Sequence, residues 1–497
     1  MIKSTFAKKS LIMILSNIAT SILGFMFSIA LSKQLGPEGM GLYGLIKPIN
    51  RIFLCIVCGG LFTAVSKVSA QYYGIGDYKN FKRTIQTSFT FTLIWSVFIS
   101  AILFFLAPAI STYIIKDVRT INAIRLLCPA VIFIALSSCI EGYFISTFQI
   151  VVPMFIDIFE KAIRICILVF VISALQTADI TSTVTGAYFA LCIGEFMSFM
   201  LLYGYYKLNI KKVPTSTHRS ESRAQLLFDT LSTSFPLLTT NLISSILSTF
   251  STLIVPRRLV EAGLDYKVAL GLIGKYNGMA KNIPFFPMVI VESISILLVP
   301  DLSRSLGNKD HNAINRRISK VLELSFLLGA TSLAITLCIG DSLGILLYKR
   351  MDLGNYIKFA ALAAPILYVS SSTFAILNGI GKQKTILRTS IIISVLRIIF
   401  LYAFTGIPSI NVYGYGLTII ITSTLSLVLN LWEINKVSPL DFSFFHSILQ
   451  VLIVVLTYFL LLMIKSLLLV APLIISSVII ILSGFSMVFF LSKIIKV

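Results

Sequence analysis

The segment GLYGLIKPINR (residues 41–51) has an echo later in the chain, GLIGKYNGMAK (residues 271–281). Both segments begin Gly-Leu-x-Gly, and an offset of 230 residues places Arg51 opposite Lys281. The first segment opens an otherwise apolar run, residues 44–62, in which Lys47 and Arg51 lie four residues apart. These charges therefore either anchor a helix at a membrane surface or act inside the membrane.

Three further pairs of segments keep the same order along the chain. They are NFKRTI (80–85) with AINRRI (313–318), IEGYF (140–144) with LNGIG (377–381), and AIRICILVF (162–170) with VLRIIFLYAF (395–404). The last pair sets Arg164 against Arg397, and the offsets drift only from 230 to about 237. We infer an internal duplication.

Composition sets the class of protein. The chain has 497 residues, of which 57% are hydrophobic and 12% are charged, whereas an average soluble domain carries about 25% charged residues. Apolar runs long enough to cross a bilayer recur along the whole chain, which indicates an all-α polytopic membrane protein. We expect about fourteen transmembrane helices, near residues 10–32, 41–66, 84–107, 122–147, 151–174, 182–206, 228–255, 270–299, 318–346, 356–379, 385–405, 412–434, 444–466 and 469–492.

The duplication predicts two lobes of six helices followed by two extra helices. Because each repeat holds an even number of helices, both keep the same orientation, which makes a parallel repeat around an axis along the membrane normal. The predicted domains are an N-lobe (1–206), a polar cytoplasmic linker (207–227), a C-lobe (228–436) and a C-terminal helix pair (437–497).

The distribution of Lys and Arg predicts the orientation. With both termini in the cytoplasm, 23 of these residues lie on the cytoplasmic side and 10 on the outer side, as the positive-inside rule requires. We therefore expect a multi-pass protein of a bacterial plasma membrane. Much of the net charge of +21 then reflects topology and attraction to anionic membrane lipids, and binding of nucleic acid is not needed to explain it.

The charges within the predicted spans are the candidate site. Lys47, Arg51, Lys275 and Lys281 have no acidic residue close by on their own helix, and opposed basic stripes in a medium of low dielectric constant would bind an anion. We expect Arg51 and Lys281 to form the core of this substrate site. For Lys47 and Lys275, anchoring at the outer surface is an open alternative. Pro48 predicts a break in the hydrogen-bond ladder of its helix near these charges.

Arg164 and Arg397 are further candidates for the substrate site. Asp157 and Lys161 are spaced i,i+4, as are Glu160 and Arg164, so the helix at 151–174 can instead neutralise its own charges. Arg397 has no acidic residue on its own helix.

Nothing in the sequence indicates an enzyme. The predicted outer loops are short and hold no cluster of catalytic Asp, Glu or His, and the chain has no Gly-rich phosphate-binding loop for ATP. We expect no catalytic residue, no metal site and no cofactor. Glu141 and Glu292 are the carboxylates that could couple transport to a cation.

Two long segments resemble a known family. LSKQLGPEGMGLYGL (31–45) is similar to the signature that follows the first helix of polysaccharide-exporting flippases. LIVPRRLVEAGLDYKVALGLIGKYNGMA (253–280) and FFPMVIVESISILLVPDLSRSLG (285–307) resemble flippases like stage V sporulation protein B. That family belongs to the multidrug/oligosaccharidyl-lipid/polysaccharide exporter superfamily.

The resemblance implies a two-lobed flippase that moves an undecaprenyl-pyrophosphate-linked sugar for cell-wall or spore-cortex peptidoglycan or a related polysaccharide. In the lipid II flippases of the superfamily, arginines on the first, second and eighth helices contact the pyrophosphate, and Arg51 and Lys281 match the second and eighth by position. The predicted first helix, 10–32, carries no charge within its apolar run, which departs from that pattern. The two C-terminal helices suggest a groove for the lipid tail.

Two alternatives stay open. One is a cation-coupled multidrug exporter of the same superfamily. The other is a membrane scaffold that recruits enzymes of cell-wall or spore-cortex assembly through its basic cytoplasmic loops. The expected partners are thus a lipid-linked oligosaccharide, anionic lipids and cell-wall synthesis enzymes.

Overall fold

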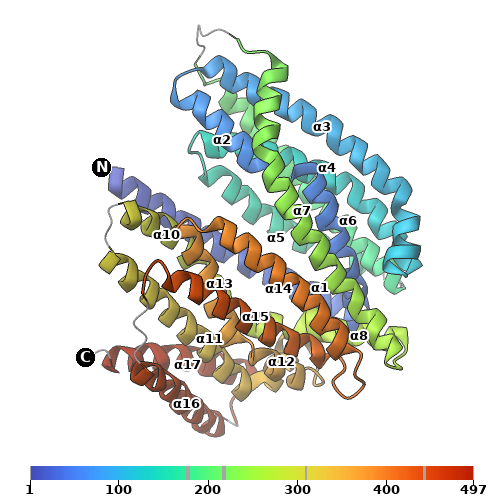
Figure 1. Cartoon of the computed structure of the whole chain (residues 1–497). Coiled ribbons are helices and arrows are strands. Elements are labelled where there is room, and N and C mark those ends of the chain that lie inside the picture. Colours follow the sequence, from blue (N-terminus) through green and yellow to red (C-terminus); the bar gives the residue numbers. More distant parts are fainter. Residues whose placement is uncertain are drawn as a thin grey trace. The chain divides into compact units, whose positions relative to one another are not determined.

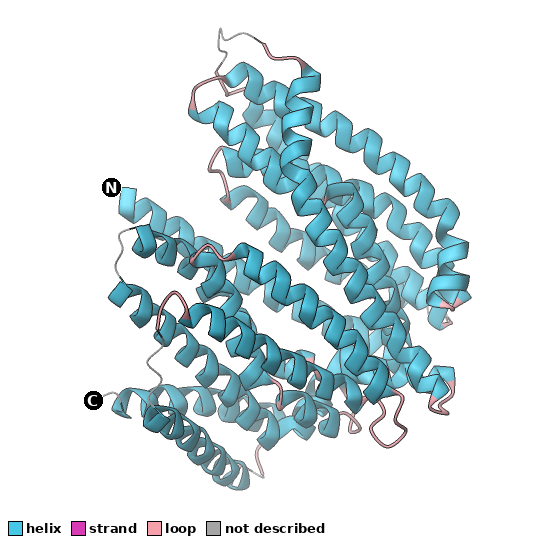
Figure 2. Ribbon diagram, in the orientation of Figure 1, coloured by secondary structure: helices cyan, strands magenta, loops and turns pink. Residues whose placement is uncertain are grey.

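The structure is a computed structural model that describes residues 2–174, 179–214, 220–307, 311–439, 444–468 and 470–495. All regular secondary structure within these ranges is helical, and short loops join the helices (Figure 2). The predicted all-α class is confirmed.

The number of candidate membrane spans depends on how the bent helix pairs are counted. Ten helical stretches are long and apolar enough to cross a membrane, or up to twelve if each of two bent helix pairs forms one span. One of the ten, Leu11–Gly74, contains two of the predicted spans. Helix α5 (Val151–Ala174), with four charged residues between Asp157 and Arg164, is not among the ten. The count of fourteen stays a prediction.

Helix α1 (Ile2–Cys58) breaks at a different residue from the one that the sequence suggested. Gly36 has φ 64° and ψ −174°, a conformation that residues with a side chain rarely adopt. The helix continues through Pro48. Proline fixes φ near its helical value and has no N–H group to donate, so Pro48 removes one hydrogen bond of the ladder without ending the helix.

The chain forms two compact units. The N-terminal unit comprises Met1–Leu35 and Leu42–Leu253, and the C-terminal unit comprises Gly36–Gly41 and Ile254–Val497. Each unit thus includes a segment from the other predicted repeat, because α7 (Arg223–Glu261) crosses the boundary. The predicted division at 207–227, part of which lies outside the described residues, stays a prediction.

The N-terminal unit is a bundle of long helices (Figure 1). Its elements besides α1, α5 and the first part of α7 are α2 (Leu61–Gly74), α3 (Tyr78–Ala109), η1 (Ile110–Ile115), η2 (Val118–Thr120), α4 (Ile121–Ser146) and α6 (Ile180–Ile210). Aromatic side chains from α3, α4 and α6 dominate one of its cores: Phe81, Tyr143, Phe144 and Phe199 are buried there. Such rings each remove a large apolar area from water.

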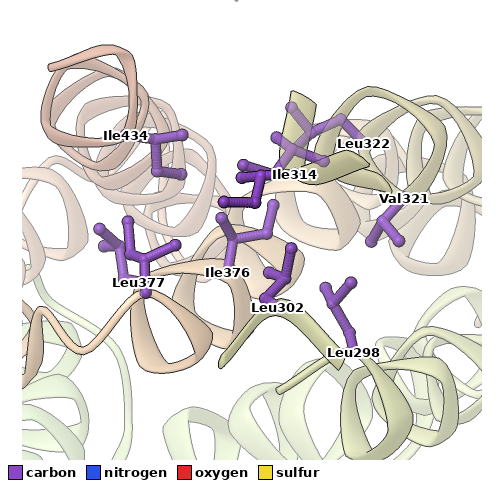
Figure 3. Packing of buried hydrophobic residues seen from close by; sticks show 10 residues of the cluster. Leu298, Leu302, Ile314, Val321, Leu322, Ile376, Leu377 and Ile434 are labelled. Atoms are coloured by element: carbon purple, nitrogen blue, oxygen red, sulfur yellow. The ribbon is translucent and has the colours of Figure 1, made fainter. Parts of the chain in front are cut away.

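The C-terminal unit holds the remaining helices. They are α8 (Tyr266–Ile273), η3 (Gly274–Ala280), α9 (Asn282–Phe285), α10 (Met288–Gly307), α11 (His311–Tyr348), α12 (Gly354–Ala361), α13 (Ala364–Gly379), α14 (Gln383–Thr405), α15 (Tyr413–Asn435), α16 (Phe444–Leu467) and α17 (Leu473–Ile495). Aliphatic side chains of α10, α11, α13 and α15 pack together in its core; Leu302, Ile314, Ile376 and Ile434 are almost fully buried (Figure 3).

The run from α8 to α10 is bent by 59°, which leaves backbone carbonyls without their helical partners. Hydroxyl groups from neighbouring helices satisfy them. Tyr348 donates to the carbonyl of Met279 at 3.2 Å, and Ser332 and Tyr368 both donate to that of Pro284, at 2.8 and 2.7 Å. The irregular backbone is therefore supported by side chains of the protein, as a break at membrane depth requires.

Two glycines allow the segment at residues 37–41 to touch the start of η3. A Cβ atom on Gly274 would lie 1.8 Å from the carbonyl oxygen of Pro37, and one on Gly41 would lie 2.3 Å from that of Leu270. Both glycines belong to the Gly-Leu-x-Gly segments. By contrast, a Cβ atom on Gly44 or Gly271 would meet nothing within 4 Å.

We predict that Gly41→Ala and Gly274→Ala each lower the free energy of unfolding by about 1–3 kcal/mol, because the added methyl group forces the two backbones apart. The measurement is the thermal unfolding midpoint of the purified protein in detergent. Gly44→Ala and Gly271→Ala, in the same two segments, are the controls and should leave the midpoint close to that of the wild type. Equal shifts for all four variants would contradict this account of the contact.

Candidate functional site

Arg51 and Lys47 lie on the second half of α1, in the N-terminal unit, and both are exposed. The Arg51 guanidinium forms no hydrogen bond or ion pair with any residue in the described ranges. Lys47 makes a further interaction and is therefore not equivalent to Arg51. Lys47 and Arg51, four residues apart on one helix, therefore differ in their interactions.

The first part of α7 packs along this half of α1. Thr249 donates to the carbonyl of Pro48 at 3.5 Å, Cys55 and Ser245 share a hydrogen bond of 3.1 Å, and Ser234 donates to the carbonyl of Gly59 at 3.2 Å. The residue numbers rise on α1 while they fall on α7, so the two helices are antiparallel. Arg51 lies between Pro48 and Cys55 and is therefore held beside α7.

Lys281 belongs to the C-terminal unit, directly after η3. Its Nζ atom lies 5.5 Å from the centre of the Tyr415 ring, a cation–π arrangement. The Tyr415 ring lies against that of Tyr276, with 6.0 Å between the ring centres. An aromatic platform on α15 and η3 therefore orients this lysine without neutralising its charge.

Lys275 has an acidic partner that the sequence did not indicate. Its Nζ atom lies 2.7 Å from an oxygen of Asp352, in the loop before α12. Arg350 also donates two hydrogen bonds to Asp352, of 2.8 and 2.7 Å. The bonds from Arg350 hold the pKa of the Asp352 carboxyl well below its ordinary value, so the group is charged at neutral pH. Lys275 has no acidic neighbour on its own helix, as the sequence shows, and its partner comes from a distant loop.

Arg164 lies among carboxylates. It forms an ion pair with Glu160 of its own helix, α5, and another with Glu195 of α6 at 2.5 Å. Lys161 pairs with Asp157 one turn earlier. Both i,i+4 pairs predicted for this helix are confirmed, while the contribution of Glu195 is new.

The absence of a side chain at Gly194 leaves space for the ion pair of Glu160 and Arg164. A Cβ atom on Gly194 of α6 would lie 2.7 Å from a Glu160 oxygen and 3.3 Å from Nε of Arg164. The Arg164 guanidinium also lies over the ring of Phe27 of α1, 6.0 Å from the ring centre. The cluster on α5 thus reaches the helix that carries Arg51.

The remaining predicted residues are dispersed. Glu141 of α4 forms no ion pair in the described part of the chain, although the charges of Asp157, Glu195 and Lys161 act on it. Arg397 on α14 and Glu292 on α10 are exposed in the C-terminal unit. The structure therefore brings Lys47, Arg51, Arg164 and Glu141 into one unit and Lys275, Lys281, Arg397 and Glu292 into the other. Their joint action on a substrate stays a prediction.

Sequence relatives define the family. The profile of the family described as "Polysaccharide biosynthesis protein" matches residues 6–306, more than half of the chain, so the chain belongs to this family. Stage V sporulation protein B of Bacillus subtilis (strain 168) is 25% identical over 444 residues, which cover 89% of this chain and 86% of that protein. The resemblance seen in the sequence motifs is confirmed.

Solved structures share the fold. The lipid II flippase MurJ in an inward closed conformation matches with a TM-score of 0.70 and 15% identity, over 97% of this chain and 98% of that chain. An inward-facing multidrug resistance MATE family transporter of the MOP superfamily matches with a TM-score of 0.67 and 16% identity, over 84% and 94%. With its many apolar helices, the chain is a multi-pass membrane protein with the fold of these transporters.

The Arg164 cluster predicts different costs for two neighbouring substitutions. Arg164→Met leaves two largely buried carboxylates, Glu160 and Glu195, without their partner and should cost about 3–5 kcal/mol of stability. Lys161→Met removes a more exposed pair on the same helix and should cost at most about 1 kcal/mol. Thermal unfolding of the purified variants measures both. Similar midpoints for the two would show that Arg164 is not the charge that holds α5 and α6 together.

Proposed function

We propose that the protein is a flippase that carries an undecaprenyl-pyrophosphate-linked sugar across the plasma membrane by alternating access. The observation that carries this proposal is the state of Arg51. Arg51 is an exposed cation within a candidate membrane span and has no ion-pair partner among the residues that the structure describes, whereas Arg164 in the same unit is paired with two carboxylates. A charge left unpaired at membrane depth normally faces a water-filled cavity or a ligand.

The chemistry of the two unpaired cations suits a diphosphate. A guanidinium group forms two parallel hydrogen bonds to phosphate oxygens, and an ammonium group supplies a point charge. Arg51 and Lys281 provide one of each, from the N-terminal and the C-terminal unit respectively. Transporters built from repeats move a bound head group across the membrane by alternating access.

The relatives support the substrate class. The names of the similar proteins refer to polysaccharide biosynthesis, spore formation and flipping of lipid II. A lipid-linked sugar is consistent with these names, and its diphosphate is consistent with the basic residues described above. For this chain we propose a precursor of cell-wall or spore-cortex peptidoglycan or of a related polysaccharide, with both termini in the cytoplasm and anionic lipids around the basic loops.

One observation favours a second candidate, a cation-coupled exporter of the same superfamily. Glu141 is half-buried in the candidate span Val118–Ser146 and has no ion-pair partner among the described residues. A carboxylate in this setting can take up a proton or a cation. The same feature would serve a flippase as its coupling site, so it does not replace the anion-site proposal. A scaffold for cell-wall enzymes would leave Arg51 unexplained.

We predict that Arg51→Ala and Lys281→Ala each lower the rate of flipping by about 10- to 100-fold, since each removes a charge-assisted contact of about 1.5–3 kcal/mol. The measurement is transfer of a fluorescent undecaprenyl-pyrophosphate-linked sugar between leaflets in proteoliposomes. Arg51→Lys should be milder if a point charge suffices and severe if the bidentate contact is required.

Lys384→Ala is the matched control, because Lys384 is also exposed but lies at the start of α14. It should flip the lipid at the wild-type rate. Wild-type rates for both Arg51→Ala and Lys281→Ala would rule out the anion site. Each variant must reach the membrane in normal amount and unfold at the wild-type temperature.

A further inference from the structure

Helix α7 is unusually polar for a membrane-spanning helix. The stretch from Asn241 to Thr252, NLISSILSTFST, contains seven hydroxyl or amide side chains near the middle of the candidate span Arg223–Glu261. In a hydrocarbon environment, each such group needs a hydrogen-bond partner, because leaving it unpaired costs several kcal/mol.

Most of these groups have a partner within the protein. Ser244, Thr249, Ser251 and Thr252 donate to the carbonyl four residues earlier on α7. Ser245 bonds with Cys55 of α1. These hydroxyls are therefore satisfied by the fold itself.

Two groups are exceptions. The Asn241 side-chain amide and the Ser248 hydroxyl form no hydrogen bond with any of the residues that the structure describes, and both residues are exposed. They are seven residues apart, or about two turns, and so share one face of the helix. This face presents two unsatisfied polar groups at the depth where lipid offers none.

The same face lies beside Arg51. Cys55 contacts the backbone carbonyl of Asn241 at 3.8 Å, and Pro48 accepts from Thr249, the neighbour of Ser248. Arg51 lies between Pro48 and Cys55 on α1. The antiparallel packing of the two helices therefore places residue Arg51 of α1 level with the segment from Ser245 to Thr249.

The polar segment also recurs in the sequence. TNLISSIL (240–247) has a counterpart in SNIATSIL (16–23) of α1, so that Asn241 matches Asn17 and Ser245 matches Ser21. The first helix of each predicted repeat thus carries an asparagine followed by hydroxyl residues. A feature kept through a duplication, in a position that opposes membrane insertion, is better explained by a ligand than by folding.

We propose that Asn241 and Ser248 bind the sugar part of the transported head group, next to the diphosphate that we assign to Arg51. A carboxamide both donates and accepts hydrogen bonds, and a hydroxyl group does the same; these are the complements of sugar hydroxyl and N-acetyl groups, whereas a diphosphate calls for cations. This inference rests on the proposed function and assigns the recognition of the glycan to α7.

Binding of two lipids by the full-length protein in detergent tests this assignment. The probes are undecaprenyl pyrophosphate and undecaprenyl pyrophosphate that carries an N-acetylated disaccharide. Asn241→Leu and Ser248→Ala should each weaken binding of the sugar-bearing lipid about tenfold and leave that of undecaprenyl pyrophosphate unchanged. Arg51→Ala should weaken both. Thr239→Val is the matched control, since Thr239 is exposed on the opposite face of α7 and donates to Phe235 of its own helix.

The outcomes separate the two claims. If Arg51→Ala loses both lipids while Asn241→Leu and Ser248→Ala bind the sugar-bearing lipid like the wild type, the assignment of the glycan to α7 is overturned and the proposed function stands. Equal loss of both lipids in the α7 variants would also overturn it, because these residues would then hold the diphosphate. If the wild type binds neither lipid, the proposed function fails, and the inference fails with it.

Discussion

A charge inside a bilayer must find a partner or face water, and this constraint accounts for how the protein treats each of its basic residues. Arg164 lies between Glu160 and Glu195, so its charge serves to join α5 to α6. Lys275 is held by Asp352. Arg51 has no such partner within the described ranges, and Lys281 rests on an aromatic ring. We therefore propose that Arg51 and Lys281, for which the described residues offer no carboxylate partner, bind the anionic ligand.

Specific backbone contacts position the segment that carries Lys281. The contact of residues 37–41 with η3 depends on Gly41 and Gly274, and it fixes the start of the segment that leads to Lys281. The bend after η3 leaves carbonyls that Tyr348, Ser332 and Tyr368 satisfy. Helix breaks that are supported in this way keep polar backbone away from lipid while the chain stays irregular near the proposed site.

Features that depend on local interactions could be predicted from the sequence. The i,i+4 pairs of α5 and the all-helical class could be predicted because both follow from periodicity and spacing. The partners Glu195 and Asp352 could not, since tertiary packing brings them from other elements. Gly36, not Pro48, breaks α1 because a left-handed conformation needs a missing side chain, whereas proline fits a helical φ angle. Charge patterning does not point to Asn241 and Ser248, because both are uncharged; the density of hydroxyl groups in α7 is the signal in the sequence that does.

The central claim is that this protein transfers a lipid-linked glycan from one leaflet to the other, and depletion of the protein in its host tests it most directly. The measurement is the amount of each undecaprenyl-linked intermediate in the cytoplasmic and outer leaflets as the protein disappears. The account predicts that one sugar-bearing undecaprenyl pyrophosphate accumulates in the cytoplasmic leaflet and declines in the outer one. Unchanged amounts of every such lipid in both leaflets would contradict transport and favour a scaffold for cell-wall assembly.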